Sequence, residues 1–412
     1  MNHKMIKHSN IKIIDFIPAI SGLIGKVALV TSFAFVWAQE LNITTPNFVF
    51  DNVRIEVIIG SIITLLVALF LPNTSPAGTL APLIVLIPSM VSFGVHPFIL
   101  SIMVGCIGII VVKTKIFNKL ILLSNHIGRS SLALTFGISG IILSAQKLLS
   151  FFGNQYIALI FLIFLLILTY VLLLRYNKSW LIIPAATIVS IVIPLLFGIS
   201  MDISVPDTTL SFNPIYWWND MWGIGFGFNI VTIIKTLPFA LFVVLLWAID
   251  TVSIKAVIHT AENSSEKNEE MNLDTSFIIV SLRNIIGGVC GGAQTSSLWR
   301  SFLIPLYMIK RPIRSSAILL GILGIIAGFT SIPIKILSFS PLIWTVLLFG
   351  IFIPFVLVGI KHLRSTQKIT QKIAILLFSA TGVFVSPILT WLAAVCFEKI
   401  EHKLMKLNNK ID

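Results

Sequence analysis

Runs of about 20 apolar residues recur along nearly the whole chain, and they constrain its fold more than any other feature. A helix of about 20 residues is roughly 30 Å long, which matches the hydrocarbon core of a bilayer. Only 11% of the 412 residues are charged and 57% are hydrophobic, whereas a soluble domain carries about 25% charged residues. Such a chain has too few polar side chains to cover a surface that faces water. The sequence therefore predicts an all-α polytopic membrane protein.

Fourteen segments are interpreted as membrane crossings, in two sets of seven. The first set is predicted at about 17–38, 55–71, 78–93, 97–113, 130–148, 155–174 and 179–198, and the second at about 230–259, 275–290, 296–309, 314–330, 338–360, 372–385 and 387–398. The predicted domains are a first repeat (1–198), an outer loop (199–229), a second repeat (230–398) and a short basic cytoplasmic tail (399–412). Because seven is an odd number of crossings, the second repeat is inverted relative to the first.

The distribution of charge supports this count and gives an orientation. With the N-terminus inside the cell, the basic loops at 113–129, 175–178, 310–314 and 361–372 face inside, as the positive-inside rule requires. The acidic residues of 40–56 and 199–229 are then expected in outer loops. The net charge of +13 follows from this bias rather than from binding to nucleic acid. The predicted location is a bacterial inner membrane, with both termini in the cytoplasm.

Two of the predicted crossings are too short to span the membrane as helices. The helical parts of 78–93 and 296–309 contain about 13–16 residues, or roughly 20–24 Å, so an extended stretch must complete each crossing. The residues that lead into them, LPNTSPAGTLAP and GGVCGGAQTSS, are rich in proline and glycine, which break helices. The third and tenth segments are therefore predicted to be half-helices preceded by short extended strands. This pattern indicates a transporter binding site, because irregular backbone at membrane depth must be buried in protein or line a cavity.

Both half-helices are expected to begin near the middle of the membrane and to face one cavity. Their first N–H groups and their dipoles attract anions, although ordinary helix capping uses the same kinds of residue. The candidate substrate-binding residues are Thr79, Leu80, Ala81, Gln294, Thr295, Ser296, Ser297 and Arg300.

Three charged residues are expected deep in the membrane. Arg300 lies in the first turn of the second half-helix, about 15 Å from the basic inner end at Lys310, so it either counters a bound anion or pairs with a protein carboxylate. Asp250 lies at a similar depth and is the candidate proton-coupling residue, or else a partner for Arg300 or Lys26. Lys26, in the middle of the first span, is a candidate charge partner. The sequence contains no metal-ligand spacing, phosphate loop or nucleophile motif, so it predicts no metal, no cofactor and no enzyme activity.

These segments resemble those of the sulfate-permease-like anion transporters and of their relatives, the nucleobase–ascorbate permeases. WAIDTVSIKAVI is similar to the family's eighth helix, which usually carries a glutamate at the position of Asp250. LRNIIGGVCGGAQTSSLWRSFLIPL resembles the ninth-to-tenth helix stretch, and the spacing of Ser297 and Arg300 favours the anion-transporting branch. LFLPNTSPAGTLAPLIVL and SPLIWTVLLFGIFIPFVLVGIKHL are similar to the second-to-third helix stretch and to the twelfth helix.

The resemblance implies fourteen segments in a seven-plus-seven inverted repeat, split into core and gate domains and often dimeric. Two departures, a weak first-helix motif and the lack of the family's regulatory domain after the last span, indicate a separate bacterial permease group.

The leading functional hypothesis is a secondary active transporter that moves a small anion or organic acid across the membrane, with proton coupling through Asp250 as one form of it. A nucleobase–proton symporter and a passive anion channel remain alternatives. The nucleobase branch usually has a carboxylate in its tenth helix, where this chain has Ser297 and Arg300. The expected partners are a small-molecule or inorganic anion, membrane lipid and a second copy of the chain in a homodimer.

Overall fold

Long apolar helices dominate the structure. The computed structural model describes residues 11–116, 119–120, 126–208, 210–262 and 271–408. Within these ranges, eight helices are long and apolar enough to cross a membrane, and three shorter apolar helices accompany them. Helices suit these segments because a chain in hydrocarbon must satisfy every backbone N–H and C=O internally.

The first half of the chain forms helices interrupted by one strand. Its elements are η1 (Ile13–Asp15), α1 (Phe16–Glu40), α2 (Phe48–Phe70), β1 (Ala77–Thr79), η2 (Ala81–Leu86), α3 (Ile87–Ser92), α4 (Pro97–Lys113), α6 (His126–Phe152), α7 (Tyr156–Arg175), η3 (Ser179–Leu181) and α8 (Ile182–Leu196). The bounds of α4 confirm the predicted 97–113. In contrast, α2 begins well before residue 55, so Asp51 and Glu56 lie in this helix and are buried instead of lying in an outer loop.

The second half follows a connecting stretch with the short helices α9 (Pro214–Tyr216) and η4 (Trp217–Met221), and it too contains one strand between helices. Its elements are α10 (Ile230–Glu262), α11 (Leu273–Val289), β2 (Ser296–Leu298), α12 (Arg300–Met308), α13 (Ile313–Thr330), α14 (Ile332–Leu337), α15 (Ser340–Leu347), η5 (Leu348–Phe352), α16 (Ile353–Ser365), α17 (Ile369–Phe384) and α18 (Pro387–Asn408). The last helix therefore continues into the predicted tail as far as Asn408.

The two strands cross between the two halves of the chain. β1 and β2 pair antiparallel, with Ala77 opposite Leu298 and Thr79 opposite Ser296. Gly78 permits this approach, because a Cβ atom at that position would lie 2.5 Å from the Cα of Trp299. The structure thus confirms the short extended stretches that are predicted before both half-helices. The backbone N–H and C=O groups of the two strands hydrogen-bond to each other where the helices are interrupted.

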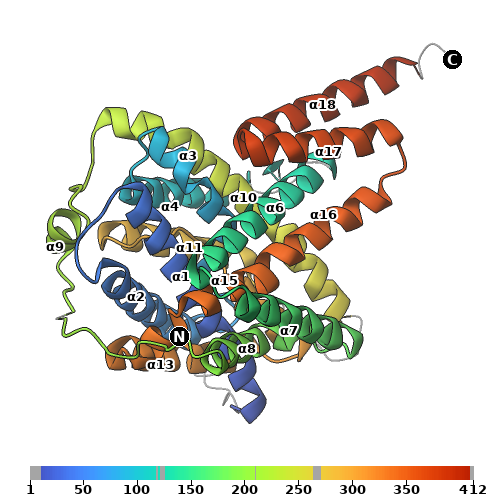
Figure 1. Ribbon diagram of the computed structural model, residues 1–412. Helices are drawn as coiled ribbons and strands as arrows, with labels where there is room; N and C mark the ends of the chain where they lie inside the picture. Colours follow the sequence, from blue (N-terminus) through green and yellow to red (C-terminus); the bar gives the residue numbers. More distant parts are fainter. Residues whose placement is uncertain (1–10, 117–118, 121–125, 209, 263–270, 409–412) are drawn as a thin grey trace, which may run out of the picture.

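The helices pack in two bundles (Figure 1). The core bundle contains α1–α4 and α10–α13 with both strands, and the flanking bundle contains α6–α8 and α15–α18. α1 lies at the border, because it also packs against α8 and α15. In Figure 1, α17 and α18 lie at one edge of the molecule and α2 and α13 at the opposite side.

Tryptophans of the connecting stretch close one end of the core bundle. The indole N–H groups of Trp218 and Trp222 donate to the carbonyls of Val289 and Gly291, each at 2.8 Å. These carbonyls belong to the C-terminal end of α11 and the loop after it, where helical acceptors have no intrahelical partner. The loop between α11 and β2 is therefore held in place by the connecting stretch.

Candidate functional site

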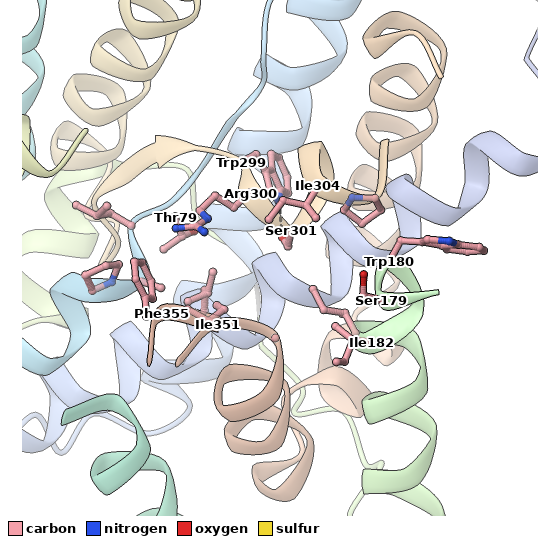
Figure 2. Close-up of a pocket in the computed structure, with 17 residues that line it drawn as sticks. Thr79, Ser179, Trp180, Ile182, Trp299, Arg300, Ser301, Ile304, Ile351 and Phe355 are labelled. Carbon is pink, nitrogen blue, oxygen red and sulfur yellow. Dashed lines mark hydrogen bonds between the residues drawn. The ribbon is translucent and has the colours of Figure 1, made fainter. Parts of the chain in front are cut away.

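A cavity of about 80 Å³ lies between the two bundles, beside the crossing of the strands. The core bundle contributes the two strand ends and the starts of the half-helices, with Thr79, Leu80, Ala81, Trp299, Arg300 and Ser301. The flanking bundle contributes the opposite wall, with Ser179, Trp180, Ile182, Ile351 and Phe355. In Figure 2, Thr79 and Arg300 lie on one side of the cavity, and Ile351 and Phe355 lie on the other.

Arg300 is the first residue of α12, immediately after the strand crossing. Its side chain is half-buried and lines the cavity, with its guanidinium carbon 4.9 Å from the centre of the Phe355 ring. The cation therefore lies against an aromatic residue of the opposite bundle. The first N–H groups of α12 have no intrahelical acceptor, so the helix dipole and Arg300 favour negative charge at the same place.

The eight predicted binding residues divide into two groups. Thr79, Leu80, Ala81 and Arg300 line the cavity. In contrast, the stretch from Gln294 to Ser297 is almost fully buried and does not line it.

The start of the second half-helix also differs from the prediction. Ser296 and Ser297 lie in β2, and α12 begins only at Arg300. The backbone N–H of Ser296 donates to Oδ1 of Asn284 at 2.7 Å, and its carbonyl accepts from the indole of Trp247 at 3.0 Å. These contacts and the partner strand hold the segment extended, so the predicted capping serines face the protein interior.

Gln294 connects the strand crossing to a buried carboxylate. The hydroxyl of Thr79 donates to Oε1 of Gln294, and Nε2 of Gln294 donates to Oε2 of Glu56 at 2.7 Å. Since Thr79 lines the cavity, this path of hydrogen bonds joins the cavity to the interior of the core bundle.

A buried charged cluster, formed by Lys26, Glu56 and Arg283, lies next to the residues that flank β2. Glu56 and Arg283 form an ion pair whose side chains are 2% and 1% exposed. Nζ of Lys26 lies 4.6 Å from the centre of the Trp299 ring and has no hydrogen-bond partner among the described residues. With all three groups ionised, the cluster carries a net charge of +1.

Two glycines make room for this cluster. A side chain at Gly60 would collide with Nζ of Lys26, and one at Gly292 would collide with the carboxylate of Glu56. The ammonium group of Lys26 and the carboxylate of Glu56 therefore occupy space that is open only because residues 60 and 292 have no side chain.

The side chain of Asp250 lies outside the described residues, although its backbone belongs to α10. Its predicted pairing with Lys26 or Arg300 therefore stays a prediction. Lys26 itself is buried beside Trp299, in a helix that contributes Leu29 to the cavity.

Sequence reasoning missed the partners in the charged cluster. The distribution of charge predicts Glu56 in an outer loop, and no sequence motif singles out Arg283. The sequence signal for this pair is one acidic and one basic residue, each within an apolar helical stretch, because such charges in a membrane protein usually pair. The aromatic walls, Trp180 and Phe355, belong to no motif that could have identified them.

A second cavity of about 60 Å³ adjoins the first and shares Leu80, Pro82, Arg300 and Phe355 with it. Its other lining residues include Arg129 and His362. Arg129 interacts electrostatically with Glu398, whose carboxylate accepts a hydrogen bond from the backbone of Ile127. In the part of the chain that the structure describes, no three His, Cys, Asp or Glu side chains are grouped to hold a metal ion.

Comparison with solved structures identifies the fold. The transmembrane domain of a cyanobacterium bicarbonate transporter, BicA, superimposes with a TM-score of 0.59 at 13% identity, over 95% of this chain and 98% of that chain. The murine anion transporter Slc26a9, in its inward-facing state, gives a TM-score of 0.57 at 13% identity, over 97% of this chain and 70% of that chain. The predicted resemblance to sulfate-permease-like transporters is thereby confirmed at the level of the fold.

At the level of sequence, no curated protein matches the chain. Residues 7–402 match the family described as "Protein of unknown function (DUF3360)". Because this match covers nearly the whole sequence, the chain belongs to that family.

Proposed function

We propose that the protein is a secondary active transporter for a small anion and that the cavity between the bundles is its substrate site. The observation that carries the proposal is the position of Arg300, which lines the cavity at the N-terminus of α12. A positive side chain and a helix N-terminus together favour an anion. The sulfate-permease-like fold adds support, since the solved transporters with this fold carry bicarbonate or other anions by their descriptions.

The cavity is proposed to open toward the cytoplasm. Ser179 and Trp180 line it, and they directly follow Arg175 and Lys178, in a basic loop that the positive-inside rule places in the cytoplasm. In this arrangement the core bundle would move relative to the flanking bundle to expose the site on the other side, as in alternating access. The wall formed by η5 supports such a role, because π-helical turns are frequent at functional sites.

The finer topology is part of the same proposal. We expect fourteen crossings in a seven-plus-seven inverted repeat, with both termini in the cytoplasm of a bacterial cell and two copies forming a dimer. The antiparallel pairing of β1 with β2 supports this arrangement, because corresponding strands of two inverted repeats run in opposite directions. Cysteine labelling of single-Cys variants from each side of the membrane would test the topology.

Binding is tested with the purified protein, the Arg300→Ala variant and a panel of anions, organic acids and nucleobases. A ligand at a hundred times its Kd stabilises the folded state by about 2.7 kcal/mol if it binds only that state. We expect an anion to raise the melting temperature of the wild type and to lose this effect in Arg300→Ala. Arg364→Ala serves as the matched control, because Arg364 is exposed at the end of α16 and does not line the cavity.

Two other results would contradict the proposal. Stabilisation by uracil or xanthine that survives Arg300→Ala would favour a nucleobase permease. Steady anion currents in liposomes, with no accumulation against a gradient, would identify a passive channel.

Proton coupling through Asp250 is proposed on sequence grounds, since residue 250 belongs to the long apolar helix α10. Asp250→Asn should abolish uptake driven by a pH gradient while exchange of substrate across the membrane continues. Unchanged gradient-driven uptake would remove Asp250 from the mechanism.

A further inference from the structure

We propose that the transported anion carries its own hydrogen-bond donor, an O–H or N–H group close to its charged oxygens, and that the hydroxyl oxygen of Thr79 accepts from this donor. This inference rests on the proposed function, because it specifies the anion that the same cavity would bind. Its basis is the direction of the hydrogen bonds that run from Thr79 into the core bundle.

Glu56 fixes the orientation of the Gln294 side chain. The carboxylate of Glu56 is paired with Arg283 and accepts a hydrogen bond from Nε2 of Gln294 at 2.7 Å. An ionised carboxylate can only accept hydrogen bonds, so the amide nitrogen of Gln294 has to face Glu56. Gln294 is 2% exposed, so water cannot stabilise the opposite orientation. The amide oxygen of Gln294 therefore points toward Thr79.

The orientation of Gln294 determines what Thr79 offers to a ligand. Because Oε1 of Gln294 is an acceptor, the hydroxyl of Thr79 donates its single hydrogen to it. The lone pairs of the hydroxyl oxygen remain, and among the described residues no other hydrogen bond involves this hydroxyl. Thr79 lines the cavity, whereas Gln294 does not. A ligand in the cavity therefore finds an acceptor at Thr79, and not a donor.

Ser301 has the opposite polarity on the same side of the cavity. The indole N–H of Trp299 donates to Oγ of Ser301 at 3.1 Å, so the hydroxyl oxygen of Ser301 already accepts and its hydrogen can be donated to a ligand. Figure 2 shows Thr79, Arg300 and Ser301 on this side. The wall thus offers a donor at Ser301 and an acceptor at Thr79, next to the first turn of α12.

The cavity is suited to a small substrate. Its volume of about 80 Å³ is several times the roughly 10–15 Å³ that a single water molecule requires by the same measure. An anion of a few non-hydrogen atoms fills such a space, and all of its polar groups then lie close to the wall. A ligand of this size cannot turn an unmatched oxygen away from Thr79 into open solvent.

These features separate two classes of small anion. An anion without a donor directs an oxygen lone pair or a methyl group at the lone pairs of Thr79, so the acceptor stays unsatisfied. An anion with its own O–H group donates to Thr79 and still accepts from Ser301. Hydrogencarbonate and small 2-hydroxy acids share this chemistry, whereas nitrate and simple alkyl carboxylates lack it.

The test compares anions that match in size and charge and differ in the donor. Hydrogencarbonate is paired with nitrate, and glycolate with propionate, and dissociation constants are measured by calorimetry with the purified full chain at pH 7.5. We expect the anion with the O–H group to bind about tenfold more tightly in a pair, which corresponds to about 1.4 kcal/mol. A preference in the first pair alone identifies a hydrogencarbonate-like substrate, and one in the second pair alone identifies a hydroxy acid. These measurements need no variant.

Variants of Thr79 test whether its hydroxyl is responsible. Thr79→Val keeps the shape of the side chain and removes the acceptor, so the preference for the O–H anion should fall to about onefold. Thr79→Ser keeps the hydroxyl and should retain the preference. Thr381→Val is the matched control, because Thr381 is exposed on α17 and its hydroxyl donates to the carbonyl of Leu377.

The outcomes separate this inference from the proposed function. If nitrate and propionate bound as tightly as hydrogencarbonate and glycolate, or more tightly, the inference would be refuted while an anion site in the cavity remained. A preference that survived Thr79→Val would also refute it, since another group would then accept from the ligand. If neither these four anions nor the wider panel bound, the proposed function itself would fail.

Discussion

Replacing Glu56 with glutamine should destabilise the protein strongly, because it removes the only negative charge from the buried charged cluster. The side chains of Glu56 and Arg283 are 2% and 1% exposed, so water cannot compensate the arginine that remains. Removing one partner of a buried ion pair typically costs about 3–5 kcal/mol. The net charge of the cluster would rise from +1 to +2 with all groups ionised. We therefore expect the free energy of unfolding to fall by about 3–5 kcal/mol.

The assay is reversible unfolding by SDS in mixed micelles, with a surface ion pair as the control. Lys368 and Glu401 form such a pair at 3.4 Å, with side chains 47% and 19% exposed. Exposed pairs contribute about 0–1 kcal/mol, so Glu401→Gln should have a small effect. An equally small loss for Glu56→Gln would refute the reasoning.

A double variant separates charge balance from packing. Glu56→Gln combined with Arg283→Met returns the net charge of the cluster to +1, and replacing both partners of a buried pair is often nearly neutral. We expect the double variant to recover most of the stability that Glu56→Gln loses. If the two losses simply added, the cost would come from packing around the side chains and not from an uncompensated charge.

Three further predictions concern other parts of the molecule. Gly78→Ala should cost about 1–3 kcal/mol in the same unfolding assay and weaken substrate binding, because its Cβ would lie 2.5 Å from backbone just after β2. Asp15→Asn should cost about 1.5–3 kcal/mol, since this buried carboxylate accepts two hydrogen bonds from Arg311, both 2.7 Å long; a loss below that of Glu401→Gln, measured in parallel, would contradict this. Hydrogen bonds from Ser204 lower the pKa of Asp202 to about 2. The folded-state pKa lies below the ordinary value of 3.8, so the contribution of Asp202 is present above pH 3.8 and is lost as the pH falls through about 2. Asp202→Asn should therefore leave the shape of the pH profile of uptake unchanged between pH 5 and 8, and a shifted profile would count against this assignment.

Local patterns in the sequence were sufficient to predict the helices and the breaks between them. The long apolar runs predicted the membrane helices because each run must satisfy its own backbone in hydrocarbon. The proline- and glycine-rich stretches predicted the short extended segments, since these residues interrupt a helix through their own backbone. The structure confirms them as β1 and β2. Arg300 could be singled out for a similar reason, because an arginine expected near the middle of the membrane is unusual in any membrane protein.

The tertiary structure alone decided which residues form the buried charged cluster, the strand crossing and the walls of the cavity. Glu56 and Arg283 are 227 positions apart, so no local pattern could show that they pair, and the position of Glu56 near a predicted helix end favours exposure to water. Ser296 and Ser297 are extended because they pair with β1, more than 200 residues away, and not because of their own conformational preference. The apolar wall of the cavity comes from the flanking bundle, where Trp180, Ile351 and Phe355 look like ordinary membrane residues. Hydrophobicity determines that such side chains leave water, but only the packing of the two bundles determines whether they face lipid or a substrate.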